Sequence, residues 1–352
     1  MEKIESKRPL IIAGPCSAES KEQTVNTALA LAKTGKVDMF RAGIWKPRTK
    51  PNTFAGMGAK ALPWLSEAKR LSGLPVSIEV ATAHHIDEAS AYDIDAFWIG
   101  ARTTSNPFSM QEVAESLRGT DKLVLVKNPI NSDIELWLGA IERLAQCDVK
   151  RIALIHRGFS SYGATILRNA PMWHLALEMR RRLPDVPMIC DPSHICGRRD
   201  LIGDIAQQAA DLNYDGLMVE SHLSPEQAKS DAKQQLTPEA LNTLLTEIKW
   251  RSAESDSAEY QIAIEELRRR IDRLDGEIFQ LLAERMNASE EIGHIKREND
   301  VMILQSARWE SIVNRILTLH EASGLSREFI RTMLDAIHIE SINRQNKVMK
   351  RR

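Results

Sequence analysis

The sequence predicts an α/β fold, a (β/α)8 TIM barrel, followed by a C-terminal domain that is entirely helical. Eight short apolar, β-branched runs recur up to about residue 220, and each is followed by a stretch of helical character. Strands that alternate with helices form a parallel sheet, and eight such units in about 250 residues fit a closed barrel better than an open doubly wound sheet. No GxGxxG motif follows the first run, which disfavours a dinucleotide-binding fold. Beyond Trp250 the strand patterns stop, and apolar residues recur at helical spacing instead.

The predicted strands are short and mostly apolar. In chain order they are PLIIAG (9–14), VDMFRAG (37–43), PVSIEVAT (75–82), IDAFWIGAR (94–102), KLVLVKN (122–128), RIALIHRG (151–158), VPMICDPSH (186–194) and YDGLMVESH (214–222). Helices are predicted between and after them, for example over 107–118, 132–146, 169–183 and 238–250. This order makes residues 1–250 the barrel domain.

A small, polar stretch without periodicity follows, and we interpret residues 251–260 as a linker. From Ile262 onward, apolar residues fall at spacings of three and four over more than thirty residues, which predicts one long helix. Two shorter helices are predicted over about 305–321 and 326–349, separated by Ser323 and Gly324. Residues 261–352 therefore form a three-helix domain.

The composition excludes several classes of protein. With 47 Lys and Arg against 48 Asp and Glu among 352 residues, the net charge of −1 gives no general attraction for nucleic acid or anionic membranes. No apolar run approaches the roughly 18 residues of a membrane span, and the charged N-terminal segment does not resemble a signal peptide. We therefore expect a cytosolic enzyme. Its four cysteines are too few for a disulfide scaffold, so each is a packed thiol or a ligand.

Polar residues stand at the carboxyl ends of the predicted strands, where (β/α)8 barrels carry their chemistry. One set combines a thiol, an imidazole and two carboxylates: Cys16, His194, Glu220 and Asp231. Alone, Cys16 is better explained as a small buried apolar residue, and His194 as a structural histidine. Because the four residues share one end of the predicted barrel, a metal site is the better interpretation. The mixed donors suit Mn, Fe, Co or Zn better than Ca or Mg.

A second set at the strand ends is cationic. Its members come from separate parts of the sequence and are Arg41, Lys46, Arg48, Arg102, Lys127 and Arg157. Any one of them is ordinarily a solvated surface charge. Six at one barrel mouth predict a substrate with several negative charges, such as a phosphorylated acid.

These residues resemble those of the 3-deoxy-D-arabino-heptulosonate 7-phosphate (DAHP) synthases. The resemblance covers about residues 8–250 and rests on GPCS (14–17), FRAGIWKPRT (40–49), IGAR (99–102), the lysine of VLVK, HRG (156–158), DPSH (191–194), MVESH (218–222) and SPEQAKSD (224–231). It implies a metal-dependent condensation of phosphoenolpyruvate with erythrose 4-phosphate that releases phosphate. The related 3-deoxy-octulosonate 8-phosphate synthases, which use arabinose 5-phosphate, carry a KANRS-like sequence where this chain has KPRT, and they are the alternative.

The resemblance also implies a role for each residue. Cys16, His194, Glu220 and Asp231 would hold the divalent metal. Arg41 and Lys46 would bind the phosphoenolpyruvate carboxylate, whereas Arg102, Lys127 and Arg157 would bind its phosphate. Arg48 and Thr49 would hold erythrose 4-phosphate. Lys46 is a candidate general acid, and Glu79 is a candidate for orienting the attacking water.

Three residues depart from the family pattern. Trp98 stands where a glutamine is frequent, Asn128-Pro129 where Arg-Gly is common, and His156 where a glutamate is frequent. We expect these changes to alter the surroundings of the phosphate and to leave its three cations intact.

In the tail, two arginines of the long predicted helix cannot serve one ligand. Arg268 and Arg285 are 17 residues apart, or roughly 25 Å along a helix. Arg285 and Lys296 are nearly in phase, and Ser341 and Gln345 share a helix face. Periodicity alone favours the interpretation that these polar residues are solvated and that the helices form an oligomerisation module.

The segment LRRRIDRLDGEIFQLLAERMNASEEIGHIK (267–296) resembles the all-helical chorismate mutases, and the resemblance extends over about 262–349. It implies rearrangement of chorismate to prephenate in an intertwined homodimer, where Arg268 serves the neighbouring copy. The implied binding residues are Arg268, Arg285, Lys296, Arg308, Ser341 and Gln345. The arginines would clamp two carboxylates, and Lys296 and Gln345 would stabilise charge on the ether oxygen.

Two acids that contact the substrate hydroxyl in this family are absent, because Gln305 and Trp309 occupy their positions. Mutase activity is therefore expected to be weakened, or Gln305 to hold the hydroxyl. The fusion also suggests that prephenate or chorismate bound in the tail inhibits the barrel. The contrasting hypothesis treats the helical tail as a dimerisation or regulatory arm without activity.

Overall fold

The computed structural model describes residues 9–46, 53–161, 166–252, 254–304, 306–319 and 323–350. The chain divides into two compact units, Met1–Ala253 and Glu254–Arg352. The candidate site residues Arg48 and Thr49, and Gln305 in the tail, lie outside the described residues. None of the described helices combines the length and the apolar character that crossing a membrane requires.

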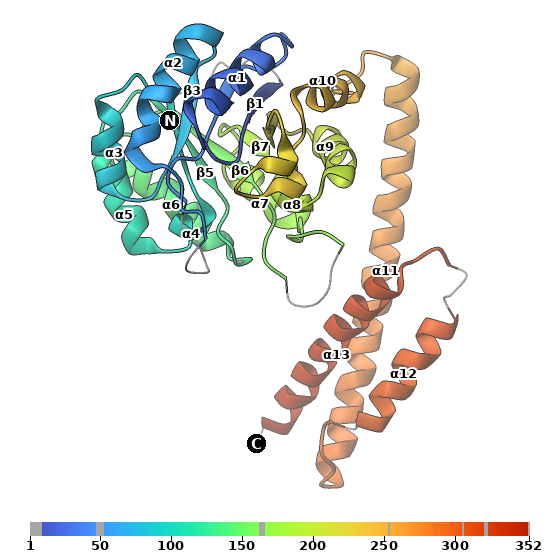
Figure 1. Cartoon of the computed structure of the whole chain (residues 1–352). Helices are drawn as coiled ribbons and strands as arrows, with labels where there is room; N and C mark the ends of the chain where they lie inside the picture. Colours follow the sequence, from blue (N-terminus) through green and yellow to red (C-terminus); the bar gives the residue numbers. More distant parts are fainter. Residues whose placement is uncertain are drawn as a thin grey trace. The chain divides into compact units, whose positions relative to one another are not determined.

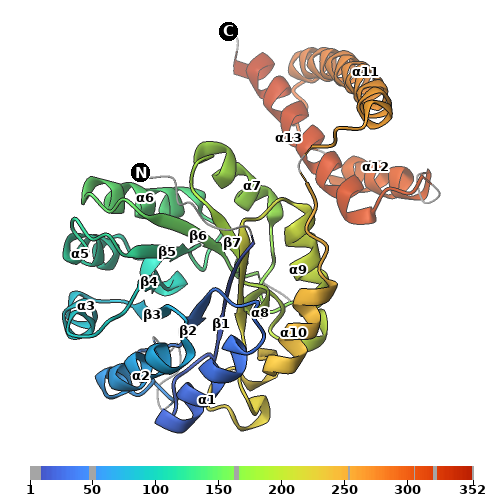
Figure 2. The same cartoon turned by 90° about the horizontal axis from the view of Figure 1, so that it is seen from above.

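The first unit is a closed barrel of eight parallel strands in sequence order (Figures 1 and 2). The strands are β1 (Leu10–Gly14), β2 (Met39–Arg41), β3 (Val76–Val80), β4 (Ala96–Ile99), β5 (Leu123–Lys127), β6 (Ile152–His156), β7 (Met188–Cys190) and β8 (Gly216–Glu220). The barrel closes where β8 pairs with β1, in a register that places Glu220 opposite Gly14. This confirms the predicted fold class.

Helices follow the strands and surround the barrel (Figure 2). They are α1 (Lys21–Ala32), α2 (Leu62–Ser72), α3 (Ala83–Ser90), α4 (Ala101–Thr104), α5 (Pro107–Ser116), α6 (Ile134–Gln146), α7 (Trp173–Arg182), α8 (Pro192–Cys196), α9 (Ile202–Asp211) and α10 (Pro238–Glu247). Several begin at capping side chains, since Ser20, Asn106 and Asp133 accept hydrogen bonds from backbone N–H groups of the first turn.

The helix predicted over 169–183 begins later, at Trp173. Ala170 instead forms an antiparallel bridge with Phe159, and Met172 has a left-handed backbone with a φ of 42°. The residues before Trp173 are thus held against the loop that follows β6, and this brings them to the barrel mouth.

The barrel core has two layers. Inside the barrel, Ile12, Trp98, Leu125 and Met218 pack against one another, and a larger apolar layer that includes Trp137 lies between the strands and the helices. A barrel interior filled by side chains is a packed core and not a pore, so polar chemistry is confined to the strand ends.

The second unit consists of α11 (Ala258–Glu298), α12 (Ser306–Leu319) and α13 (Arg327–Lys350). Helix α11 begins inside the stretch 251–260 predicted as a linker, because the Ser257 side chain caps it by accepting from the Tyr260 N–H. A small apolar cluster of Val313, Leu317 and Ile330 joins α12 to α13. Gly293 of α11 lets α13 approach closely, since a Cβ there would lie 3.2 Å from Gln345 Cα.

Candidate functional site

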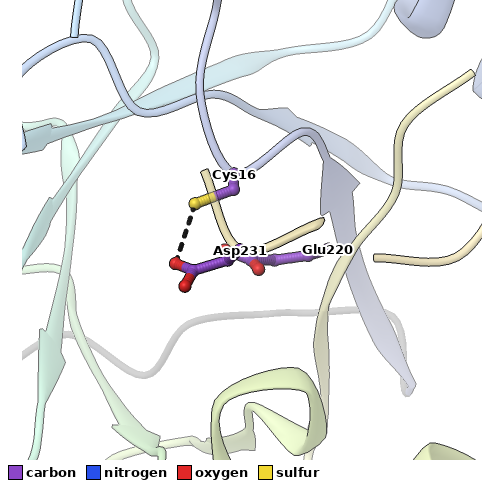
Figure 3. Close-up of side chains that lie close together, drawn as sticks. All are labelled: Cys16, Glu220 and Asp231. Carbon is purple, nitrogen blue, oxygen red and sulfur yellow. Dashed lines mark hydrogen bonds between the residues drawn. The ribbon is translucent and has the colours of Figure 1, made fainter. Parts of the chain in front are cut away.

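Three of the four predicted metal ligands converge at the carboxyl end of the barrel (Figure 3). Cys16 follows β1, Glu220 ends β8, and Asp231 precedes a short 3-10 turn. Their ligand atoms all lie within 4.8 Å of one another, and the Cys16 thiol donates to Asp231 Oδ2 over 3.2 Å. The β1–β8 pairing that closes the barrel is what joins residues 16 and 220.

His194, the fourth predicted ligand, lies beside this group. Its Nε2 is 3.8 Å from Glu220 Oε1, and its Nδ1 is 2.8 Å from Asp191 Oδ2. One ring nitrogen therefore lies beside a carboxylate while the other faces the ligand cluster, and metal-binding histidines often have a carboxylate at their second nitrogen. Burial lowers the pKa of His194, although Asp191 opposes this shift, and a neutral ring is the form that binds a metal.

The group fits a divalent cation. Glu220 is fully buried, and its Oε1 has no hydrogen-bond partner although Oε2 accepts from Gln234 over 2.7 Å. Burial, together with Glu220, raises the pKa of the Cys16 thiol to about 12. A bound cation would compensate the carboxylates and displace the thiol proton. Sulfur, imidazole and carboxylate donors together are typical of a transition-metal site.

A cavity opens beside this group. Within the described residues it is lined by Lys46, Glu79, Gly100, Ala101, Arg102, Lys127, Arg157, Arg168, His194 and Asp231. Four of the predicted cations are therefore brought together with Glu79 and two of the predicted metal ligands. The Lys46 ammonium is 3.1 Å from Cys16 Sγ, which links the cationic set to the ligand group.

Arg41 lies beneath the same region with two unsatisfied donors. Its side chain is 1% exposed, and Nη2 is 3.4 Å from Glu220 Oε1. Nε and Nη1 are buried without a hydrogen-bond partner. Trp98 lies under the guanidinium, 4.6 Å from the ring centroid. This tryptophan therefore packs against a buried cation.

Arg157 and Lys127 are buried cations with fixed positions. Arg157 donates from its backbone to Asn128 Oδ1 over 2.7 Å and from Nη1 to Asn169 Oδ1 over 2.9 Å. Lys127 Nζ is 2.7 Å from Asp191 Oδ2. Burial lowers the pKa of Arg157 to about 10. An anion in the cavity would offset the cost of burying these charges.

Arg168 and Asn169 were not among the predicted site residues. Arg168 donates to Asp231 Oδ1 over 3.0 Å and to Gln234 Oε1 over 2.7 Å. Asn169 accepts a hydrogen bond from Arg157 through Oδ1, and its Nδ2 donates to the backbone carbonyl of His194 over 2.6 Å. No signal in the sequence marks them, because they follow no strand and our helix prediction began at residue 169.

His156 was expected near the phosphate, but it belongs to the core. The ring is fully buried, and it contacts the Tyr214 hydroxyl over 2.9 Å and the Pro171 carbonyl over 2.7 Å. It therefore ties the chain before α7 to the barrel wall.

This placement predicts a pH dependence of stability. Burial lowers the pKa of folded His156 from 6.5 to about 4, so the unfolded chain binds the extra proton between these values. The contribution of His156 to stability is complete above pH 6.5 and is lost as the pH falls to about 4, a change of about 3 kcal/mol. Urea unfolding between pH 7 and pH 4 should show this extra loss in the parent relative to His156→Gln, and parallel curves would contradict it.

The helical unit holds a second cavity, formed by all three helices. Its described lining residues are Arg285, Ala288, Ser289, Ile292, Lys296, Ile303, Arg308, Trp309, Ile312, His338, Ser341 and Gln345. Five of the six predicted mutase residues are among them. Arg268 is not, and it is exposed on α11.

Hydrogen bonds arrange the polar residues of this cavity. Arg285 donates to the Ser341 hydroxyl over 2.6 Å, and Lys296 donates to the Ile303 carbonyl over 2.6 Å. The buried Oε1 of Gln345 has no partner. Three cations and no acid among the described lining residues make this cavity suited to a dianion.

The fold and the two cavities define a class of protein: a (β/α)8 barrel with a cationic cavity at its carboxyl end, joined to a helical domain with a cationic cavity of its own. Residues 3–255 match the model of the DAHP synthetase I family, and residues 267–346 match chorismate mutase type II. The chain belongs to the DAHP synthetase I family and carries a chorismate mutase type II domain at its C-terminal end. Both are enzyme families.

Individual relatives carry the names of two related aldolases, and the heptonate aldolase described first is more similar to this chain than the octonate aldolase described last. The phospho-2-dehydro-3-deoxyheptonate aldolase of Thermotoga maritima is 35% identical over 239 residues, which are 68% of this chain and 68% of that protein. The crystal structure of that aldolase has a TM-score of 0.62 at 31% identity, over 70% of this chain and 71% of that one. A 2-dehydro-3-deoxyphosphooctonate aldolase of Citrifermentans bemidjiense is 26% identical over 271 residues, covering 70% of this chain and 93% of the relative.

Proposed function

We propose that the barrel condenses phosphoenolpyruvate with erythrose 4-phosphate to DAHP and phosphate, with a divalent metal held by Cys16, His194, Glu220 and Asp231. The observation that carries this proposal is the meeting, at one barrel end, of a three-member ligand group with His194 beside it and a cationic cavity. The donor chemistry favours Mn, Fe, Co or Zn. When bound, such a metal would polarise the aldehyde carbonyl of the sugar phosphate.

The chain's own residues would bind and orient the two substrates. The unsatisfied nitrogens of Arg41 suit the phosphoenolpyruvate carboxylate. Arg102, Lys127 and Arg157 would hold its phosphate, so that its carbon 3 faces the aldehyde at attack distance. Lys46 can deliver a proton, and the Glu79 carboxylate, which lines the same cavity, can orient the water that attacks carbon 2. Arg48 and Thr49 are assigned to erythrose 4-phosphate by the family resemblance alone.

One coupled assay tests this function. We expect phosphate release from phosphoenolpyruvate with erythrose 4-phosphate, little with arabinose 5-phosphate, and loss of activity after treatment with a chelator. Returning Mn²⁺ or Co²⁺ should restore it. Preference for arabinose 5-phosphate would support the octulosonate alternative, the class to which the name of the relative from Citrifermentans bemidjiense belongs. Undiminished activity with chelator would remove the metal from the proposal.

For the helical unit, we propose rearrangement of chorismate to prephenate. Arg285 and Arg308 would hold the two carboxylates of the compact conformer, while Lys296 and Gln345 would stabilise charge on the ether oxygen. The reaction needs no nucleophile or metal, so a rigid cationic cavity is sufficient.

We further propose that the helical unit forms a homodimer. Apolar residues of α11 recur at alternating spacings of four and three, and their exposed fractions are 52% for Leu267, 55% for Ile271, 40% for Leu274, 43% for Ile278 and 64% for Leu281. This spacing is typical of a helix that pairs with another helix. In such a dimer, Arg268 would reach the cavity of the second copy.

The predicted cytosolic location stays a prediction.

Feedback control is the last part of the proposal: prephenate bound in the helical cavity would inhibit the barrel. Binding linkage is reciprocal, so metal and phosphoenolpyruvate should weaken the binding of prephenate by the same factor by which prephenate weakens theirs. Calorimetric titration of prephenate with and without Mn²⁺ and phosphoenolpyruvate measures this factor. Equal affinities would exclude coupling through binding.

A further inference from the structure

The mutase cavity contains a histidine that none of the preceding assignments uses. His338 of α13 lines the cavity and stands on the same helix face as Ser341 and Gln345, which follow it at i+3 and i+7. Trp309 of α12 stacks flat on its ring, with a centroid separation of 4.0 Å and an interplanar angle of 13°. Two helices thus fix the plane of the imidazole.

The ring has spare hydrogen-bonding capacity. Between residues 254 and 350, leaving out the undescribed positions, no hydrogen bond to either ring nitrogen of His338 is found, and stacking on Trp309 is its described contact. Burial lowers the pKa of His338, and Arg285 adds to this shift while Asp335 opposes it. A neutral imidazole carries one acceptor nitrogen and one N–H.

Chorismate presents two carboxylates, an ether oxygen and a hydroxyl group. The cations of the cavity account for the carboxylates, but a hydroxyl proton needs an acceptor. The described lining residues include no Asp or Glu. Ser341 already accepts from Arg285 and donates to the Ile337 carbonyl. Among the described lining side chains, the acceptors that remain are Ser289, His338 and Gln345.

His338 and Gln345 stand at opposite ends of the cavity, and Ser289 of α11 lies one turn before Gly293, toward the Gln345 end. Seven residues of α13 separate them, or about 10 Å along the helix. Gln345 lies against Gly293 of α11, whereas His338 lies against Trp309 of α12. Gln345 is assigned to the ether oxygen above, which leaves the α12 end to His338.

We propose that His338, fixed by its stack on Trp309, is a specificity-determining residue of the mutase cavity that accepts a hydrogen bond from the hydroxyl group of the bound dicarboxylate. An imidazole at this place recognises a hydroxyl without adding a negative charge, so the cavity keeps its full attraction for the two carboxylates. The inference rests on the mutase function proposed above and gives that site a residue for hydroxyl recognition.

The test compares two substrates and two histidine variants in the full chain. The substrates are chorismate and its analogue in which hydrogen replaces the hydroxyl, each rate being divided by its uncatalysed rate. His338→Phe keeps an aromatic ring against Trp309 and removes both nitrogens, and His338→Asn keeps a hydrogen-bonding side chain. We expect His338→Phe to lower kcat/KM for chorismate about 10-fold, the effect of one neutral hydrogen bond, and to change the value for the analogue less than 2-fold. His338→Asn should recover part of the loss.

Trp309→Phe, which retains an aromatic ring, is the matched control and should alter both substrates equally. An equal loss for both substrates in His338→Phe would assign His338 a structural role and overturn the inference while leaving the mutase function intact. If His338→Phe does not fold, the parent chain provides the test. Its rate enhancement over the uncatalysed reaction should be at least about 10-fold larger for chorismate than for the analogue, and equal enhancements would overturn the inference. A parent that does not rearrange chorismate would overturn the mutase proposal itself.

Discussion

Replacing Cys16 by serine is expected to lower the condensation activity at least about 100-fold. Loss of a group that only orients a ligand costs about 10- to 100-fold in metal affinity or activity, and Cys16 would be a ligand itself. The thiol stands between Asp231 and Lys46, at 3.2 and 3.1 Å. Steady-state rates with phosphoenolpyruvate and erythrose 4-phosphate at saturating Mn²⁺ measure the effect.

Two controls separate loss of metal from loss of fold. Chorismate rearrangement by the same Cys16→Ser chain should be unchanged, since the barrel ligands take no part in that reaction. Cys147→Ser alters another buried cysteine, one whose Sγ contacts Arg118, and should retain condensation. Titration with Co²⁺ should give a thiolate-to-metal absorption band in the parent that Cys16→Ser lacks. A parent without this band, or a fully active Cys16→Ser, would refute the assignment.

Arg285→Ala is expected to lower kcat/KM for chorismate about 100-fold or more. The guanidinium lines the helical cavity and fixes the Ser341 hydroxyl over 2.6 Å, so the change removes a carboxylate clamp and frees a neighbouring polar group. Misplacing a bound substrate by about 1 Å can already cost 100-fold. The loss of chorismate absorbance measures the rate.

Arg273→Ala provides the matched control on the same helix. Arg273 is exposed and pairs with Glu277 at 2.6 Å, away from the lining residues of the cavity, so its removal should change the rate less than 2-fold, as is usual for exposed ion pairs. Equal effects of the two variants would contradict the cavity assignment. A parent without any mutase activity would instead support the hypothesis that the tail is a dimerisation arm.

Much of the barrel site was predictable because local patterns place it. Each strand is a short apolar run, and the loop that follows it starts at the barrel mouth once the barrel closes. Cys16, Glu220 and Lys127 could therefore be assigned to one rim from their positions alone. In the helical unit, the phase of a helix placed Lys296 with Arg285 and Ser341 with Gln345, and all four line the same cavity.

Other features had no local signal. His156 follows the pattern of a strand-end residue, yet its ring turns into the core, because Tyr214 and the Pro171 carbonyl supply partners there. Arg168 and Asn169 reach the site because the bridge between Phe159 and Ala170 holds their segment at the barrel mouth. The start of α11 at Ala258 depends on a cap by Ser257 inside a stretch whose composition resembles a linker.

The sequence by itself determined the order of strands and helices and the two enzyme domains, because periodicity and motif spacing are properties of neighbouring residues. Only the tertiary structure decided which residues contact one another: Cys16 with Asp231, Asn169 with the Arg157 side chain and the His194 carbonyl, and Trp309 with His338. These pairs join residues from separate elements, and their distances follow from barrel closure and helix packing. Local patterns do not specify such distances, since each depends on how every intervening element packs.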